Sequence, residues 1–377
     1  MIVMEDPIIY IIGMGIDGKP VKGRGASGQL SNRYTQYNYG VLHEEGIDEV
    51  EGDALRTKYI AGNARTILNK VTSPDVGMAW SVNPYQGCEH GCAYCYARPT
   101  HEYWGYDAGL DFERVIIMKR NAPELLASAL RDPKWKGEPI SFSGNTDCYQ
   151  PVERKERITR RALEVASAFR QPVGVITKNA LVLRDLDILS EMAAHRLATV
   201  AISLTTLNED LRRVLEPRTS SGANRLRTIE ALSGAGIPVF VMVAPIIPAL
   251  NEHELPTLLK AAADAGAKGA GYTIVRTNGP VEVVFRAWLE HHFPDRASKI
   301  IAQIGSAHGG RMNDSTFGRR MRGEGAFAEN IRRLFHVMRR RYFADRSLPE
   351  LDSSLFRRPP QGQLGLFDPP LDDHHRS

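Results

Sequence analysis

Residues 83–98 read NPYQGCEHGCAYCYAR and place Cys88, Cys92 and Cys95 at CxxxCxxC spacing, directly after an expected strand. Cysteine thiolates are the usual protein ligands of iron–sulfur clusters, and three of them can bind three irons of a cubane while the fourth iron stays open. An open iron can bind a small molecule. The spacing therefore predicts a catalytic iron–sulfur cluster in this loop.

A structural zinc ion is the alternative interpretation of the same cysteines. Zinc in a closed site takes four ligands, and His90 or His101 could supply the fourth. Structural zinc cysteines usually occur as CxxC pairs, whereas this loop carries an asymmetric triplet. The spacing favours the iron–sulfur cluster.

Beyond the loop, short β-rich runs alternate with helical patterns over about residues 78–280. The expected strands are 79–83, 115–118, 140–143, 173–177, 199–204, 239–244 and 271–275. Helical stretches separate them, for example 157–169, 184–195, 223–235 and 254–265. Repeated βα units imply right-handed crossovers, so we expect an α/β fold built as a partial or near-complete parallel (β/α) barrel of about six strands. A doubly wound open sheet is the structural alternative.

Three segments flank the expected barrel, which we assign to residues 76–280. Residues 17–75 are rich in Gly, Ser and Asn, and we expect residues 1–75 to form an N-terminal extended arm with little core of its own. Residues 281–346 are helical in pattern and basic, which predicts a C-terminal helical extension. Residues 347–377 are rich in Pro and Gly and predict a flexible tail.

Composition excludes several classes of protein. The chain has 377 residues, of which 42% are hydrophobic and 24% charged, with a net charge of +4, so it is no obvious polyanion binder as a whole. Four cysteines, three of them crowded into one loop, cannot form a useful disulfide framework, and we expect a cytoplasmic protein. The apolar run at residues 8–16 is too short to span a bilayer, so no membrane association is expected.

The cysteine loop resembles the signature of the radical S-adenosylmethionine (SAM) superfamily, CxxxCxΦC, with Tyr94 at the aromatic position. The resemblance covers roughly residues 78–275. It implies a [4Fe–4S] cluster held by Cys88, Cys92 and Cys95, whose open iron binds the amino and carboxylate groups of SAM. One electron then cleaves the sulfonium bond, giving methionine and a 5′-deoxyadenosyl radical that abstracts a substrate hydrogen. An electron donor such as flavodoxin or ferredoxin is implied as a partner.

Within the superfamily, the segment FSGNTDCYQPVER at 142–154 is similar to the branch that contains spore photoproduct lyase. The resemblance implies that Thr146 contacts the SAM amino group and Lys178 its carboxylate. It assigns Ser203 to a ribose or carboxylate contact. All three residues follow expected strands, where ligands bind in such folds. The alternatives are a turn cap for Thr146, a solvated charge for Lys178 and a local hydrogen bond for Ser203.

Cys148 departs from the pattern of that branch. Spore photoproduct lyase uses a fourth cysteine as a hydrogen-atom donor, but that cysteine would correspond to a position close to Gly144. We carry Cys148 as a candidate hydrogen donor, with a buried inert thiol as the alternative.

Three more residues near the expected site have two interpretations each. Glu216 and Arg218, in VLEPRTSSGANR, could line the pocket or form an ion pair that fixes a loop. Tyr96 could serve as a radical relay or pocket wall, or it could pack with its hydroxyl bonded.

The C-terminal region suggests macromolecular partners. Between Arg311 and Arg346 there are ten arginines and four acidic residues, which predicts a DNA-binding segment, with a solvated helix face as the alternative. The tail segment QLGLF begins at Gln363 and resembles the sliding-clamp-binding peptide QLxLF, in which Leu366 and Phe367 would be the apolar anchors. The alternative for the tail is an accidental match.

Together these features predict a radical SAM enzyme of the spore-photoproduct-lyase-like branch, with DNA or a damaged nucleobase as the leading substrate. The basic segment and tail carry this DNA-repair hypothesis. One rival is an iron–sulfur protein that binds nucleic acid or senses redox state without SAM chemistry. The other is a radical SAM enzyme acting on RNA, a peptide or a metabolite.

Overall fold

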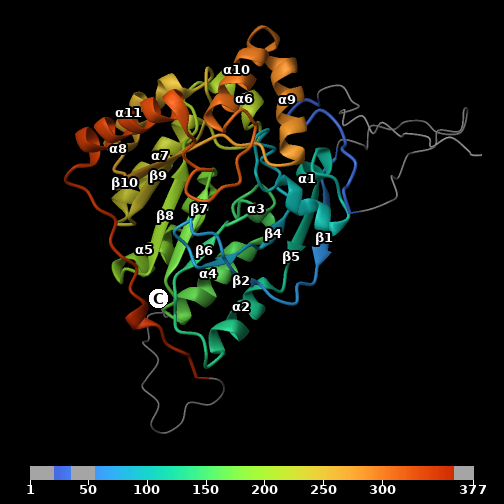
Figure 1. Ribbon diagram of the computed structural model, residues 1–377. Coiled ribbons are helices and arrows are strands. Elements are labelled where there is room, and N and C mark those ends of the chain that lie inside the picture. The colour runs from blue at the N-terminus through green and yellow to red at the C-terminus, as the bar shows by residue number, and fades with distance from the viewer. Residues whose placement is uncertain (1–20, 35–55, 361–377) are drawn as a thin grey trace, which may run out of the picture.

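The computed structural model describes residues 21–34 and 56–360. Its centre is a seven-stranded sheet in the order β10-β9-β8-β7-β6-β3-β2 (Figure 1). The strands are β2 (Leu68–Lys70), β3 (Trp80–Val82), β6 (Ile140–Phe142), β7 (Val173–Thr177), β8 (Ala198–Ser203), β9 (Val239–Ile246) and β10 (Gly269–Ile274). Six strands run parallel, and β2 is antiparallel to β3. In the described residues the two edge strands, β2 and β10, do not pair, so the expected partial barrel is confirmed and no closed barrel forms.

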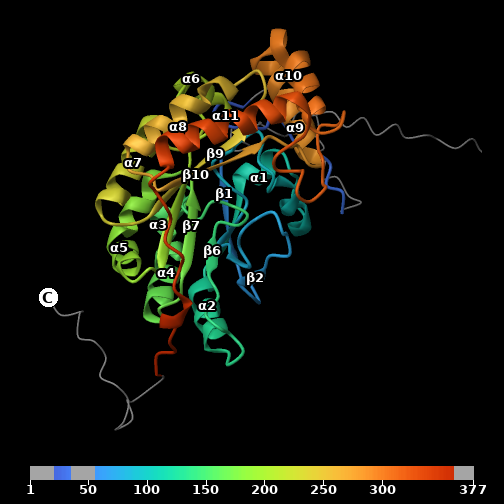
Figure 2. The same ribbon diagram turned by 60° about the vertical axis from the view of Figure 1, so that its left-hand side comes forward.

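Helices cover the convex face of this sheet (Figures 1 and 2). They are α4 (Ile158–Ala168), α5 (Leu186–Ala194), α7 (Gly222–Gly234) and α8 (Leu255–Asp264). In β7, Val173 and Val175 are buried, whereas Gly174 and Ile176 are only half-buried, and β8 and β9 alternate likewise. Because successive strand side chains point to opposite faces, the buried set packs under the helices and the other set lines a partly accessible concave face.

The strand predicted at residues 115–118 forms, but it does not belong to the seven-stranded sheet, so its expected place in the barrel is wrong. It forms β5 (Val115–Lys119) in a separate three-stranded sheet, between β1 (Lys58–Gly62) and β4 (Tyr85–Gln86). β5 is parallel to β1 and antiparallel to β4. All but the last residue of β5 are buried, and such an apolar run indicates burial without indicating which strands will pair with it.

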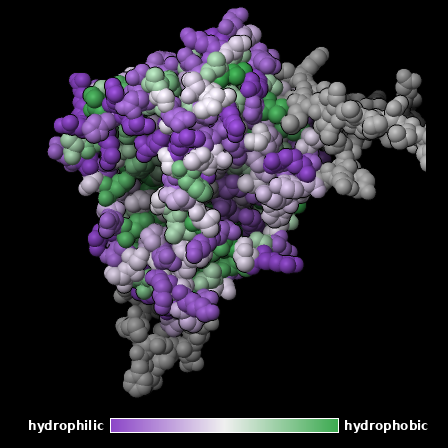
Figure 3. All heavy atoms as spheres, in the orientation of Figure 1, coloured by the Kyte–Doolittle hydropathy of each residue, from purple (hydrophilic) through white to green (hydrophobic). Residues whose placement is uncertain are grey.

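The C-terminal helices extend the barrel beyond β10. They are α9 (Pro280–His292), α10 (Pro294–Ala307) and α11 (Gly325–Phe343). α11 packs along α8 and α10 (Figure 2). The ring centroid of Phe335 in α11 lies 4.6 Å from that of Tyr272 in β10. The opposite side of α11 is exposed and mostly polar, as the upper left of Figure 3 shows.

After α11 the chain returns along the outer helices as far as residue 360. Arg346 donates to the carbonyls of Ala263 and Ala267, and Phe356 stacks on Phe169. The expected divisions at residues 75, 280 and 346 stay a prediction, and the QLGLF segment lies outside the described residues. No helix in the described ranges is long and apolar enough to cross a membrane.

Shorter elements complete the described fold. The α-helices are α1 (Leu110–Arg114), α2 (Ala122–Arg131), α3 (Glu153–Glu156) and α6 (Glu209–Leu215). Short 3-10 helices span Arg98–Trp104, Ala180–Asp185, Glu252–Glu254 and Ser353–Leu355.

Candidate functional site

The cysteine loop lies between β4 and the 3-10 helix at Arg98–Trp104. Cys88 and Cys92 are buried and Cys95 is half-buried. The loop turns at Gly91, where φ is +64° and a Cβ atom would lie 2.7 Å from the Glu113 carboxylate. A left-handed backbone without space for a side chain requires glycine. The backbone conformation and the lack of space for a side chain therefore explain why residue 91 of the CEHGC segment is a glycine.

A buried ion pair supports this loop from beneath. Arg98 donates to the carbonyl of Cys92 at 2.9 Å and pairs with Glu113 at 2.5 Å, and both side chains are fully buried. The Glu113 carboxylate also accepts hydrogen bonds from the backbone of Gly25 and Ala26. The pair therefore joins the N-terminal segment to the cysteine loop, a connection that no sequence pattern indicates.

The three thiols lie close enough to affect one another electrostatically. Burial raises the pKa of Cys88, and the nearby charges of Asp147, Cys95 and Cys92 raise it further. Burial also raises the pKa of Cys92, while Lys178 partly offsets this shift. Bound iron would supply the positive charge that stabilises these three thiolates, so the residues fit an iron–sulfur cluster. Among residues 21–34 and 56–360, no three His, Cys, Asp or Glu side chains form a group that could hold a single metal ion.

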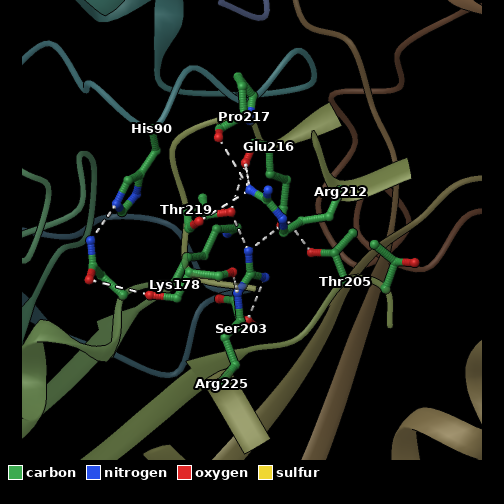
Figure 4. Close-up of polar contacts among 12 residues, drawn as sticks. His90, Lys178, Ser203, Thr205, Arg212, Glu216, Pro217, Thr219 and Arg225 are labelled. Carbon is green, nitrogen blue, oxygen red and sulfur yellow. Dashed lines mark hydrogen bonds and ion pairs between the residues drawn. The ribbon is translucent and has the colours of Figure 1, made fainter. Parts of the chain in front are cut away.

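The carboxylate of Glu216 organises the space beside the loop (Figure 4). It accepts hydrogen bonds from the hydroxyls of Tyr94 and Thr205 and pairs with Arg225 at 2.5 Å. Arg225 in turn donates to the carbonyl of Ser203 at 3.0 Å. Glu216 and Arg218 do not pair: Glu216 binds Arg225, and Arg218 lies 3.6 Å from Glu89. The ion pair expected between Glu216 and Arg218 is therefore wrong, and the buried partner of Glu216 is Arg225.

Three of the predicted cofactor residues come together around this network. The Tyr94 hydroxyl binds Glu216, and the Lys178 ammonium lies 6.0 Å from the centre of the Tyr94 ring. Ser203 ends β8, is buried and is tied to Arg225 through its carbonyl. In the part of the chain that the structure describes, the Lys178 ammonium makes no hydrogen bond or ion pair. It is therefore available to an anionic group.

Thr146 and Cys148 lie apart from the Glu216 network. The Thr146 hydroxyl is buried and donates to the carbonyl of Tyr85 at 2.7 Å. Cys148 is fully buried and packs in the main core with Tyr149, whereas the loop cysteines belong to other apolar clusters. This placement matches the inert-thiol alternative for Cys148, and its role as a hydrogen donor stays a prediction.

Tyr96 and Arg276 lie on another side of the loop. Tyr96 is 48% exposed, and its hydroxyl donates to the carbonyl of Gly144 at 2.9 Å. Arg276 follows β10 and is half-buried. Burial and the nearby Arg320 charge lower its pKa, and the neighbouring Tyr96 and Asp75 offset only part of this shift. Within the described residues Arg276 makes no hydrogen bond or ion pair, so its guanidinium is available to an anion.

Comparison with known proteins places the site in a family. The model of the radical SAM superfamily matches residues 82–262. The uncharacterized protein Rv2578c of Mycobacterium tuberculosis is 34% identical over 238 residues, which cover 62% of this chain and 70% of that protein. The uncharacterized protein MJ0683 of Methanocaldococcus jannaschii is 29% identical over 191 residues, covering 51% of this chain and 68% of that protein. The chain belongs to the radical SAM superfamily.

Solved structures agree at the level of the fold. Spore photoproduct lyase complexed with dinucleoside spore photoproduct superposes with a TM-score of 0.56 at 19% identity, covering 76% of this chain and 79% of that one. A variant of the same lyase with bound AdoMet matches with a TM-score of 0.55, also at 19% identity, over the same shares of the two chains. The protein is thus an enzyme of the radical SAM class, and this membership implies SAM and an iron–sulfur cluster as cofactors.

Proposed function

We propose that the chain reductively cleaves SAM at a [4Fe–4S] cluster held by Cys88, Cys92 and Cys95. The observation that carries the proposal is the grouping of three mutually interacting thiols, two buried and one half-buried, beside the Lys178 ammonium, which makes no hydrogen bond or ion pair within the described residues. When bound and reduced, the cluster supplies one electron to the sulfonium of SAM, which releases methionine and a 5′-deoxyadenosyl radical. That radical takes a hydrogen atom from the substrate.

Some side chains of the protein bind SAM directly, and others position the residues that bind it. Lys178 binds the SAM carboxylate, because an ammonium forms strong charge-assisted hydrogen bonds with carboxylates. Glu216 and Arg225 hold Tyr94 and the end of β8 in place, through contacts to the Tyr94 hydroxyl and the Ser203 carbonyl. Thr146 and Ser203 remain proposed contacts to the amino group and to the ribose or carboxylate.

We infer that the substrate is anionic, with DNA or a damaged nucleobase as the first candidate. Arg276 and exposed Tyr96 offer a cation and an aromatic ring near the carboxyl end of β10, and together they suit phosphate binding and base stacking. The loop that carries Arg311 and Arg320 joins the same end of the sheet, since Ile274 and Thr277 donate to the carbonyls of Met321 and Met312.

Anaerobic reconstitution tests the enzymatic proposal. Wild type should contain iron and sulfide and should form 5′-deoxyadenosine from SAM when reduced by dithionite. Cys92→Ser should lose both the cluster and the product, whereas the matched control Cys148→Ala should keep both, because Cys148 lies outside the loop. A wild-type protein with an intact cluster and no 5′-deoxyadenosine would refute the proposal.

The same purified protein can be used to test the two alternative functions. A cluster protein without SAM chemistry would bind DNA equally with and without SAM and would form no cleavage product. For an enzyme on RNA, a peptide or a metabolite, deuterium would move into 5′-deoxyadenosine from those labelled substrates and not from labelled DNA.

A further inference from the structure

We propose that two stacked tyrosines, Tyr34 and Tyr103, form a platform on which an unpaired base of a single-stranded nucleic acid stacks. The inference rests on the proposed function, in which the substrate is anionic and DNA is the first candidate, and it names the form of nucleic acid that the protein binds. This surface, named here the tyrosine platform, consists of Arg33, Tyr34 and Tyr103.

The tyrosine platform is built on an exposed aromatic pair. The ring centroids of Tyr34 and Tyr103 lie 4.9 Å apart with an angle of 23° between the ring planes, and the Tyr34 hydroxyl donates to the Tyr103 hydroxyl at 3.3 Å. Tyr103 is 72% exposed and Tyr34 is 57% exposed. Within the described residues no second ring and no cation packs on Tyr103, so the outer face of its ring is open to a flat partner.

Hydrogen bonds fix the tyrosine platform on the 3-10 helix at Arg98–Trp104. The Nε atom of Arg33 donates to both carboxylate oxygens of Glu102, at 2.9 and 3.1 Å, and Glu102 is buried. The side chain of Asn32 donates to the carbonyls of Glu102 and Tyr106, each at 3.0 Å. A ring that is already held in place loses little conformational entropy on binding. The platform is therefore preorganised although its rings are exposed.

The tyrosine platform adjoins the residues that the proposed function assigns to the substrate. A Cβ atom at Gly279 would lie 3.4 Å from the guanidinium of Arg33. Asn278, the preceding residue, donates through its side chain to the carbonyl of Tyr96 at 3.5 Å. Only three residues therefore separate Arg276 from the position that contacts the platform, so one bound strand can reach both places.

The chemistry of this surface favours unpaired bases over duplex DNA. Bases in a duplex are stacked on their neighbours, whereas unpaired bases are free to stack on aromatic side chains. Because Glu102 already neutralises Arg33, the platform offers aromatic faces and little free charge. The half-buried guanidinium of Arg276, which has no ion-pair partner in the described ranges, supplies a cation for the phosphate chain. Aromatic rings beside a cation are typical of single-strand binding sites.

Binding of fluorescently labelled oligothymidylate and oligouridylate to the cluster-loaded protein tests the tyrosine platform. Tyr34→Ala/Tyr103→Ala should bind single strands on the order of tenfold more weakly than wild type, because base stacking on the rings is lost. The loss should be equal at low and high salt, since no charge is removed. The matched control Tyr34→Phe/Tyr103→Phe keeps both rings and should bind as wild type does. Affinity for a blunt duplex should be the same in all three proteins.

The binding measurement is independent of SAM cleavage. If wild type forms no 5′-deoxyadenosine with dithionite, the proposed function fails, and oligonucleotide binding still decides on the tyrosine platform. The tighter of the two ligands, oligothymidylate or oligouridylate, identifies the nucleic acid as DNA or RNA, and the variants are compared with that ligand. The platform is overturned if wild type binds no oligonucleotide or if the alanine variant binds single strands as wild type does. An equal loss in the phenylalanine control, or with the duplex, would overturn it as well.

Discussion

At the scale of single residues, Glu216 shows how the site holds a charge away from water. Burial by itself would raise its pKa, but the positive charges of Arg225 and Lys178 and the hydrogen bond from Tyr94 outweigh it and lower the pKa to about 2. A buried carboxylate with this many partners stabilises the fold only while it is ionised. The site therefore depends on pH through this residue.

We expect the unfolding free energy of the protein to decrease as the pH is lowered, because of the buried carboxylate of Glu216. Its folded-state pKa lies below the ordinary value of 4.5, so its contribution is complete above about pH 5 and is lost as the pH falls toward 2. The loss amounts to roughly 3 kcal/mol of unfolding free energy. Urea unfolding of the cluster-free protein should be measured between pH 3 and pH 7. The unfolding free energy of Glu216→Gln should decrease less steeply than that of wild type as the pH is lowered, and at pH 7 the variant should be less stable than wild type. Parallel pH profiles for the two proteins would contradict this account.

At the scale of elements, the buried Arg98–Glu113 pair joins the cysteine loop to α1 and to residues 25 and 26. Removing one partner of a buried pair typically costs about 3–5 kcal/mol, because the other charge stays unpaired. Arg98→Met should therefore unfold at lower urea concentration and lose iron on reconstitution. The matched control Arg120→Met breaks the exposed pair with Glu156 and should change the unfolding free energy by less than about 1 kcal/mol. Equal effects of the two variants would argue against the supporting role.

The elements also show what a sequence can and cannot predict. The strands and helices of the barrel follow from local periodicity, and the proposed cluster ligands follow from the spacing of three cysteines. Periodicity did not place β5, because it reports burial and not pairing. Arg98 and Glu113 are 15 residues apart and Glu216 and Arg225 are 9 apart, and neither separation carries a recognisable pattern. Only the fold brings these partners together.

At the scale of the whole molecule, the tail offers a separate test of a DNA-linked role. Gln363 opens the QLGLF segment, in which Leu366 and Phe367 are the expected anchors. Because apolar anchors dominate such interfaces, Leu366→Ala/Phe367→Ala should weaken binding to a bacterial sliding clamp by more than about tenfold. Leu371→Ala, just outside the segment, is the control and should bind as wild type does in a pull-down and by calorimetry. Absence of wild-type binding would identify the segment as an accidental match.

The exposed arginines of α11 allow the DNA-binding hypothesis to be tested through the salt dependence of DNA affinity. Arg332 and Arg333 pair with Glu329, whereas Arg339, Arg340 and Arg341 are exposed and have no ion-pair partner within the described residues. Each phosphate contact contributes about −0.9 to the slope of log affinity against log salt. Replacing the three unpaired arginines by glutamine should therefore weaken duplex binding at low salt and flatten that slope by up to about 3 × 0.9. The control Arg332→Gln/Arg333→Gln should flatten it less, because Glu329 already neutralises part of that charge. If the two variants have the same slope as wild type, α11 is a solvated helix face, and DNA binding, if any, belongs to the loop near Arg276.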